Sequence, residues 1–259
     1  MRSLFTLVVL AAFSAPAFAE VKTKDVDYKF DGVTFKGQIA YDDSISGKRP
    51  GVLVVHEWWG LNDYAKGRAA ELAKLGYVAF ACDMYGNGQL AKHPKEAQEF
   101  ATTVRKNVDV WRGRAKAAYD ILAKHELVDA TKLAAIGYCF GGSTALQLAY
   151  TGADLKAVAT FHAALPEPTP EQAKSIKASI LVCHGADDNF IPKEAITKFK
   201  TALSENSKHP LQFESYPGTV HSFTVPDADK HMITGMAYNA EADKKSWASM
   251  KVLFAKAFK

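Results

Sequence analysis

The pentapeptide Gly137-Tyr138-Cys139-Phe140-Gly141 limits the possible folds of this chain more than any other feature. It has the glycine, variable, nucleophile, variable, glycine form of a nucleophile elbow, with cysteine where serine is usual. Such an elbow is a tight turn from a strand into a helix, which holds the nucleophile in a strained backbone conformation above the sheet. Glycine at both ends leaves room for the turn. The motif therefore predicts a strand, a reactive thiol and a helix in that order.

The residues on either side of the motif fit this prediction. Residues 132–136 form a short apolar run typical of a buried strand, and the small residues of 142–150 are typical of a tightly packed helix. The alternative is that Cys139 is an inert core residue, because free cysteine is among the most buried residue types. The pentapeptide alone does not separate the two interpretations.

The rest of the chain alternates between strand-like and helix-like segments. The dipeptide Asp31-Gly32 between residues 26–30 and 33–41 predicts a hairpin of two antiparallel edge strands. Six apolar runs follow, at 52–55, 77–81, 133–136, 157–161, 180–183 and 211–216. Helices are predicted at 64–75, 94–104, 111–124 and 240–258. The pattern predicts an α/β fold, a mostly parallel twisted sheet with helices on both faces and an N-terminal antiparallel hairpin.

The first 19 residues have the features of a secretory signal, namely Arg2, an apolar run at 4–13 and Ala17-Phe18-Ala19 as a cleavage site. The apolar run is too short to span a bilayer, so we expect a secreted or periplasmic protein without a stable membrane anchor. Residues 20–259 suit a single α/β domain, because no repeat or linker divides them.

Charge and cysteine content narrow the class of protein further. A formal net charge of +4 over 259 residues is too small and dispersed to indicate nucleic-acid binding. Three cysteines are an odd number for an oxidising compartment, so at least one thiol stays free unless it pairs between chains. Cys82 and Cys183 end apolar runs and are expected in the core, which leaves Cys139 as the thiol to explain.

A cysteine nucleophile needs a base, and the base needs an acid that orients it. In the hydrolase order of nucleophile, acid and histidine, the last two follow later strands. The loop after 180–183 has a G-x-x-D-x-x-I-P pattern whose aspartate is Asp188, with Asp187 the less favoured neighbour, and the loop after the last run contains His221. Asp188 could instead cap the helix near Pro192, and His221 could be a solvated surface residue.

The segment His56-Glu57-Trp58-Trp59-Gly60 follows the first buried run, where an oxyanion hole is expected. We assign the hole to the backbone N–H groups of Trp58 and Phe140. Glu57 is expected to project toward Cys139, where its charge would oppose ionisation of the thiol, unless it simply pairs with a lysine. Four aromatic residues that could equally belong to the core are expected to bind substrate: Trp59, Tyr85, Phe190 and Phe223.

Taken together, these motifs resemble the dienelactone hydrolase (carboxymethylenebutenolidase) family of the α/β-hydrolase superfamily. They cover essentially all of residues 20–259, in the order 56–60, Asp83-Met84-Tyr85, 137–142, 188–192 and His221-Ser222-Phe223. The resemblance implies an α/β-hydrolase fold, a triad of Cys139, His221 and Asp188, and no metal or organic cofactor. It also implies that Glu57 contacts the resting thiol and moves away when substrate binds.

The function expected from the resemblance is hydrolysis of a small ester or enol-lactone through a thioester acyl-enzyme. Two other classes remain open. A thiol redox or sensing protein is disfavoured because no C-x-x-C or nearby resolving cysteine accompanies Cys139, and a non-catalytic binding protein is disfavoured by the complete triad. His162, Cys183 and His184 lack the spacing of metal ligands.

One position departs from the family pattern. Family members that act on dienelactone hold the substrate carboxylate with arginines, one of them four residues after the catalytic histidine, and Val225 occupies that position here. Valine cannot neutralise a carboxylate, so half of the clamp is missing. Arg105 or Lys106 could supply the other half, or could merely solvate a helix face. We therefore expect neutral or aromatic esters and lactones to be preferred over anionic dienelactone.

Overall fold

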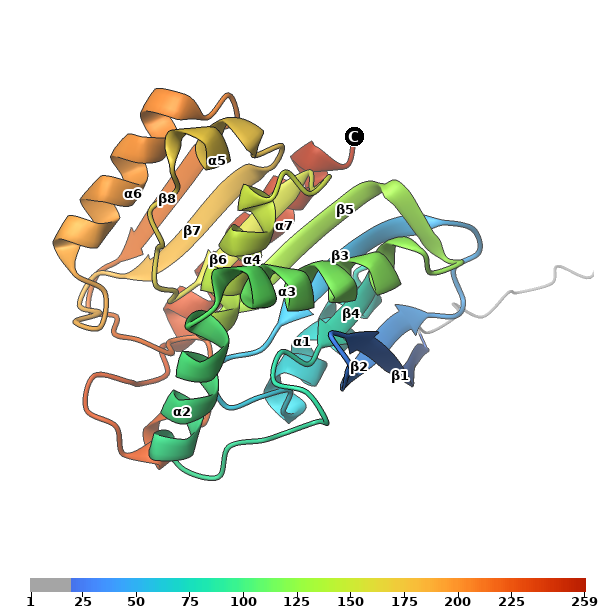
Figure 1. The fold of residues 1–259 in the computed structure, drawn as a ribbon, viewed down its shortest axis with the longest axis horizontal. Helices are drawn as coiled ribbons and strands as arrows, with labels where there is room; N and C mark the ends of the chain where they lie inside the picture. Colours follow the sequence, from blue (N-terminus) through green and yellow to red (C-terminus); the bar gives the residue numbers. More distant parts are fainter. Residues whose placement is uncertain (1–19) are drawn as a thin grey trace, which may run out of the picture.

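A computed structural model describes residues 20–259, and the signal sequence predicted for residues 1–19 lies outside them. One sheet of eight strands runs through the described residues in the order β1-β2-β4-β3-β5-β6-β7-β8 (Figure 1). The strands are β1 (Val21–Phe30), β2 (Val33–Asp42), β3 (Arg49–Val55), β4 (Val78–Cys82), β5 (Val128–Tyr138), β6 (Ala157–Phe161), β7 (Ser179–Gly185) and β8 (Leu211–Tyr216).

The sheet has the predicted mixed character. β1 and β2 form an antiparallel hairpin, whose turn at Asp31 and Gly32 has φ values of 48° and 74°. Left-handed backbone at both positions is what a two-residue hairpin turn of this sequence needs. β2 pairs antiparallel with β4, and every other neighbouring pair is parallel. The prediction of an α/β fold with an N-terminal hairpin is confirmed.

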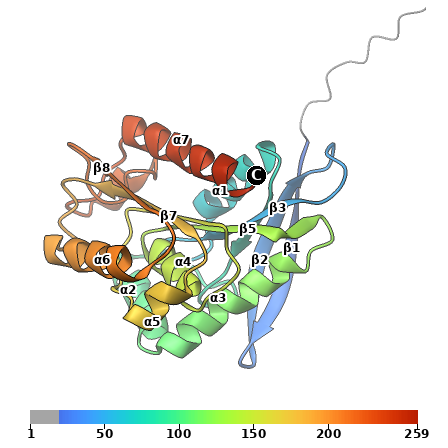
Figure 2. The ribbon, with the colours of Figure 1, turned by 90° about the horizontal axis from the view of Figure 1, so that it is seen from above.

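Helices cover both faces of the sheet, as Figure 2 shows. α1 (Asp63–Lys74) and α7 (Ala240–Ala257) lie on one side. The other side carries α2 (Pro94–Arg105), α3 (Val108–Ala123), α4 (Phe140–Tyr150), α5 (Pro170–Ser175) and α6 (Lys193–Asn206). A 3₁₀ turn, η1, spans Ala228–His231. Because both faces are covered, every residue of β4 and β6 is buried, which explains their continuous apolar sequences.

Local signals account for several element ends. Asn62 caps α1 as predicted, its side chain accepting from Ala65 N–H at 3.3 Å. The six-residue α5 was not predicted, since it is too short for a helical hydrophobic pattern, although its sequence holds a capping box of Thr169 and Gln172.

The free cysteines divide as the sequence suggested. Cys82 and Cys183 are fully buried and unpaired in the core, whereas Cys139 is partly exposed. Within residues 20–259, none of the helices has the length and apolar character needed to cross a bilayer.

Candidate active site

Cys139 sits on a sharp turn between β5 and α4. Its φ of 50° and ψ of −113° are unusual for a residue with a side chain, and its N–H donates to the carbonyl of Phe161 at 2.9 Å. A Cβ atom on Gly137 would lie 2.1 Å from the carbonyl oxygen of Gly141, and one on Gly141 would lie 2.2 Å from that of Val55. Only glycine fits at either position. The turn therefore has the geometry of an elbow and places the thiol at the N-terminal end of α4, which favours negative charge.

Asp188 lies in the loop after β7 and is buried. Its Oδ2 accepts from Nδ1 of His221 at 2.7 Å, and its Oδ1 accepts from the N–H of Phe190 at 2.9 Å. The neighbouring Asp187 is exposed. Pro192 is the N-cap of α6, which has no side-chain cap. Asp188 therefore orients His221 instead of capping α6.

His221 lies in the loop after β8 and is 3% exposed. Its backbone is fixed by hydrogen bonds to Gly235 and from Ala237, both at 3.1 Å. Burial acts to lower the pKa of His221, but the negative charge and hydrogen bonding of Cys139 and Asp188 outweigh it and raise the pKa to about 10. The imidazole is thus held in an environment that stabilises its protonated form.

Cys139 and His221 line the same cavity, of about 320 Å³. The other lining residues are Trp58, Gln98, Arg105, Ala164, Phe190, Ile191 and Met236. An adjoining cavity of about 340 Å³ shares Arg105, Ala164, Phe190 and Ile191 with the first. Its further walls include Trp111, Leu165 and Pro166, so it is mainly apolar.

The structure differs from the sequence prediction for three of the four aromatic residues. Phe190 lines the cavity, with its ring 5.2 Å from that of His221. The other three lie in the core beside the cavity: Trp59, Tyr85 and Phe223. Trp59 stacks on His231 at 4.2 Å, whereas Phe223 is fully buried against the rings of His162 and Tyr216. Their positions next to the motifs did not determine where their side chains point.

Arg105 supplies the positive charge at the cavity, whereas Lys106 is not part of the lining. The guanidinium carbon of Arg105 lies 5.3 Å from the centre of the Phe140 ring. Gln98 also lines the cavity, seven residues earlier in α2, so both side chains project from one face of that helix. Within residues 20–259, Arg105 forms no ion pair. Because Val225 replaces the second arginine of the family pattern, Arg105 provides the guanidinium that faces the cavity.

The two backbone N–H groups assigned to an oxyanion hole lie at the ends of β3 and β5. Phe140 is the first residue of α4, so its N–H has no acceptor within the helix. Trp58 lies in the turn after β3, and Tyr85 Oη donates to its carbonyl at 2.8 Å. The buried Asp83 carboxylate holds Tyr85 in place by accepting from its N–H at 2.8 Å. Tyr85 thus stabilises the turn that contains Trp58.

Glu57 is buried, and its Oε1 accepts from the hydroxyl of Ser222 at 3.1 Å. Nδ1 of His162 lies 4.0 Å from the same oxygen. Burial raises the pKa of Glu57 to about 7, although the charge on His221 and the hydrogen bond from Ser222 lower it. Among the hydrogen bonds of residues 20–259, Glu57 has Ser222 as its side-chain partner and not Cys139, which differs from the contact that the sequence suggested. Sequence reasoning considered His162 only to set aside a metal-ligand role and missed its position beside Glu57, as it missed the cavity-lining Gln98, Ile191 and Met236.

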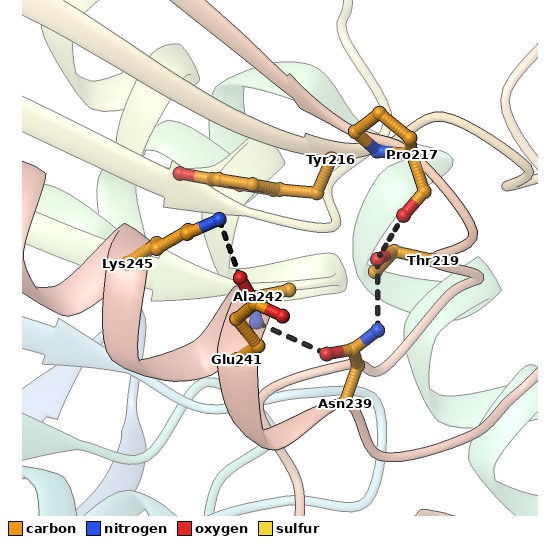
Figure 3. Close-up of a pocket in the computed structure, with 7 residues that line it drawn as sticks. All are labelled: Tyr216, Pro217, Thr219, Asn239, Glu241, Ala242 and Lys245. Carbon is orange, nitrogen blue, oxygen red and sulfur yellow. Dashed lines mark hydrogen bonds and ion pairs between the residues drawn. The ribbon is translucent and has the colours of Figure 1, made fainter.

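A separate hollow of about 270 Å³ lies behind the His221 loop (Figure 3). Asn239, the N-cap of α7, donates to the hydroxyl of Thr219 at 3.1 Å, and Glu241 pairs with Lys245 at 2.6 Å. The Glu241–Lys245 pair lies within α7, so it is the Asn239–Thr219 hydrogen bond that holds the loop before His221 against the start of α7.

Comparisons with known proteins agree with this architecture. Residues 35–258 match the model of the dienelactone hydrolase family. Protein usf of Aquifex pyrophilus is 29% identical over 202 residues, which cover 76% of this chain and 85% of that protein. The solved structure of m3DLH is 41% identical, with a TM-score of 0.89 and coverage of 92% of this chain and 99% of that one. The crystal structure of the dienelactone hydrolase-like promiscuous phosphotriesterase P91, from metagenomic libraries, is 40% identical, with a TM-score of 0.89 and coverage of 92% and 98%.

Proposed function

The chain belongs to the dienelactone hydrolase family and is a hydrolase of esters or lactones, and on that premise we propose that it acts through a Cys139, His221 and Asp188 triad. The observation that carries the proposal is the shared cavity. It contains an elbow-mounted thiol and a histidine whose Nδ1 is bonded to a buried aspartate at 2.7 Å. This is the arrangement that a nucleophile, its base and an orienting acid require.

The first half of the reaction forms a thioester. The Cys139 thiolate attacks the carbonyl carbon, and the carbonyl oxygen takes up the electron pair as an oxyanion. The N–H groups of Trp58 and Phe140 are the proposed donors to it. When the tetrahedral intermediate collapses, the carbon–oxygen bond to the alcohol breaks and the His221 imidazolium gives its proton to the departing alkoxide. For a lactone, the alkoxide stays attached to the acyl group.

The second half returns the free enzyme. Neutral His221 removes a proton from water as the water oxygen attacks the thioester carbon. The second tetrahedral intermediate expels the Cys139 thiolate, which leaves the carboxylic acid product and restores the imidazolium. Asp188 keeps the ring in the orientation that directs its other nitrogen toward the thiol in both halves.

The cavity walls support a preference for neutral or aromatic esters and lactones. Trp58, Phe190 and Ile191 provide apolar surface, and the adjoining apolar cavity gives room for a longer acyl or alcohol group. Arg105 adds one cation, which can pair with one substrate carboxylate in a bidentate manner but lacks the second arginine of the family clamp.

A burst assay with a p-nitrophenyl ester tests the proposal. We expect one equivalent of p-nitrophenol to be released rapidly from the wild-type protein, followed by slower turnover, and no burst from Cys139→Ala. Cys82→Ala serves as a matched control, because Cys82 is a buried thiol outside the cavity. A burst that persists in Cys139→Ala would refute the assignment of the nucleophile.

Phosphotriester hydrolysis is a second candidate, favoured by the 40% identity to the promiscuous phosphotriesterase P91. A neutral phosphotriester presents a P=O group that Trp58 and Phe140 could polarise as they would a carbonyl. Release of nitrophenol from a p-nitrophenyl dialkyl phosphate by the wild type, and its loss in Cys139→Ala, would support this activity. No release above the uncatalysed rate at millimolar substrate would exclude it.

A further inference from the structure

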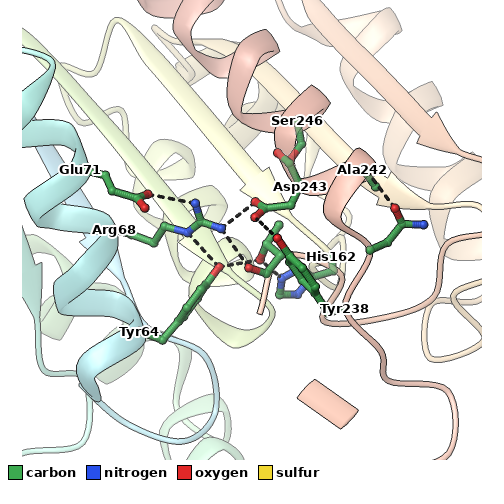
Figure 4. A network of polar contacts seen from close by, with 10 residues as sticks. Tyr64, Arg68, Glu71, His162, Tyr238, Ala242, Asp243 and Ser246 are labelled. Carbon is green, nitrogen blue, oxygen red and sulfur yellow. Dashed lines mark hydrogen bonds and ion pairs between the residues drawn. The ribbon is translucent and has the colours of Figure 1, made fainter. Parts of the chain in front are cut away.

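A chain of hydrogen bonds leads from α1 into the site. Arg68 lies at its outer end, surrounded by Tyr64, Glu71 and Asp243 (Figure 4). The Arg68 side chain is nearly buried and donates to Glu71 at 2.9 Å, to Asp243 at 2.6 Å and to the carbonyl of Thr224 at 2.9 Å. Its Nε–H donates to the hydroxyl of Tyr64 at 3.2 Å. All these contacts hold the guanidinium in one orientation.

Two more hydrogen bonds continue the chain to His162. The Tyr64 hydroxyl lies 2.6 Å from Thr224 Oγ1, which lies 2.8 Å from Nε2 of His162. His162 and Thr224 are buried, and Nδ1 of His162 has no hydrogen-bond partner among the described residues. Oε1 of Glu57 lies 4.0 Å from this nitrogen. The imidazole therefore accounts for the last step of the chain, and its Nδ1 faces the carboxylate without a hydrogen bond to it.

The direction of these hydrogen bonds follows from the donor chemistry of arginine. A guanidinium can only donate, so the Tyr64 oxygen accepts from Arg68 and has its own proton left to give. The remaining partner of Tyr64 is Thr224, whose Oγ1 accepts the hydrogen bond from the Tyr64 hydroxyl. The Thr224 hydroxyl then donates its own hydrogen bond to Nε2 of His162. Nε2 is then the unprotonated nitrogen of a neutral ring, and the proton sits on Nδ1.

We propose that Arg68 fixes the tautomer of His162 through Tyr64 and Thr224, so that the Nδ1–H group faces Glu57 and favours the ionised form of its carboxyl group. In this role Arg68 and Thr224 are positioning residues that act through His162. Nothing in the hydrogen-bond pattern requires a substrate, so the proposal goes beyond the hydrolytic function.

The opposite tautomer would conflict with the rest of the chain. If Nε2 carried the proton and donated to Thr224, one hydroxyl proton of Tyr64 or Thr224 would be left buried without an acceptor. The Nδ1 lone pair would then face Glu57, which is favourable only when the carboxyl is protonated and donates to it. Protonation of Glu57 and the tautomer of His162 are therefore coupled.

The other titratable groups near Glu57 do not replace this contact. His221 acts on it as a positive charge that lowers its pKa, and burial raises that pKa to about 7. Tyr64 and Tyr85 also face it and are neutral, since burial raises the pKa of each phenol well above 10. Burial lowers the pKa of His162 well below 6.5, so this ring meets Glu57 as a neutral dipole.

The tautomer can be measured directly by ¹⁵N NMR of the histidine rings in the ligand-free protein, with His162→Gln used to assign the resonances. At a pH above the Glu57 titration, we expect Nε2 of His162 to show the shift of an unprotonated nitrogen and Nδ1 that of a protonated one. The reverse assignment in the wild type would overturn the proposal. No substrate is involved, so the outcome is distinguishable from failure of the proposed hydrolysis.

Thr224 provides a matched pair of variants. Thr224→Val removes the hydroxyl that donates to Nε2 in the proposed tautomer, whereas Thr224→Ser keeps it. We expect Thr224→Val to raise the pKa of Glu57 by up to about one unit, because Nε2 loses one hydrogen bond that keeps it unprotonated. The ¹³C resonance of the Glu57 carboxyl group reports this pKa. Thr224→Ser should titrate like the wild type. Equal Glu57 titrations in the two variants would refute the role of the hydroxyl.

Discussion

Asp188→Asn tests the link between the acid and the base most directly. The change replaces a carboxylate 2.7 Å from Nδ1 of His221 by an amide of the same size. A hydrogen bond to a charged group contributes about 1.5–3 kcal/mol, so its loss should lower kcat/KM by about ten- to 150-fold. Cys139→Ala should cost about 10³-fold or more, since it removes the nucleophile itself. Asp187→Asn is the control, because Asp187 is exposed and the carboxylate bonded to His221 is that of Asp188.

The assay is kcat/KM for a p-nitrophenyl ester, combined with melting temperatures at two pH values. The pKa of His221 is raised from 6.5 to about 10, so the stability that comes from its protonation is present in full below about pH 6.5 and is lost as the pH rises toward 10. The melting temperature of Asp188→Asn should therefore fall further below that of the wild type at pH 6 than at pH 10. Equal losses of activity in the two asparagine variants would show that the acid has been misassigned.

Three further predictions concern the thiol and the substrate. Cys139→Ala and His221→Ala should each abolish ester hydrolysis with native circular dichroism, and the double variant should be no worse than either single one; additive losses would contradict a shared role. Glu57→Gln should speed iodoacetamide labelling of Cys139 at pH 8, because an ionised Glu57 opposes the thiolate; an unchanged rate would mean that Glu57 does not control the thiol. Arg105→Gln should lower kcat/KM for a dienelactone carboxylate more than for its methyl ester. If the wild type prefers the carboxylate over the methyl ester by tenfold or more, about 1.4 kcal/mol, the site contains a second cation.

The sheet and its elbow could be predicted because their signals are local in the sequence. Asp31-Gly32 specifies a turn that only left-handed backbone can make, and the glycines of the elbow lie where a Cβ atom would collide with a carbonyl oxygen. Continuous apolar runs such as that of β6 indicate strands covered on both faces. The order of nucleophile, acid and histidine then placed Asp188 and His221 at one edge of a parallel sheet, where the structure brings them into contact.

Side-chain directions could not be predicted in the same way. Trp58 and Trp59 are neighbours in one turn, yet Trp58 lines the cavity and Trp59 packs on His231. Arg105 could be separated from Lys106 only once α2 was placed, since one helix position turns a side chain by about 100° around the axis. Such choices depend on tertiary packing, which no short motif records.

The hydrogen-bond chain behind Glu57 is a stronger example, because its partners are far apart in sequence. Tyr64 and Thr224 are separated by 160 residues, and His162 and Thr224 by 62. Hydroxyl, imidazole and guanidinium groups at such distances give no pattern in a single sequence. Their functional meaning comes from the rule that a guanidinium cannot accept, and that rule applies only after the fold has brought the groups together.

The loop after β8 connects the proposed triad to this chain. Within four residues it provides His221 to the acid, the Ser222 hydroxyl to Glu57 and the Thr224 hydroxyl to the hydrogen-bond chain. Ser222 has a φ of 57°, which is unusual for a residue other than glycine, so the loop is held in a strained form by its contacts. Arg68 donates to the Thr224 carbonyl, which anchors the backbone of this loop. It also donates to the Tyr64 hydroxyl, which sets the direction of the hydrogen bonds in the chain. A change in α1 can therefore alter both the position of the base and the charge of the glutamate beside it.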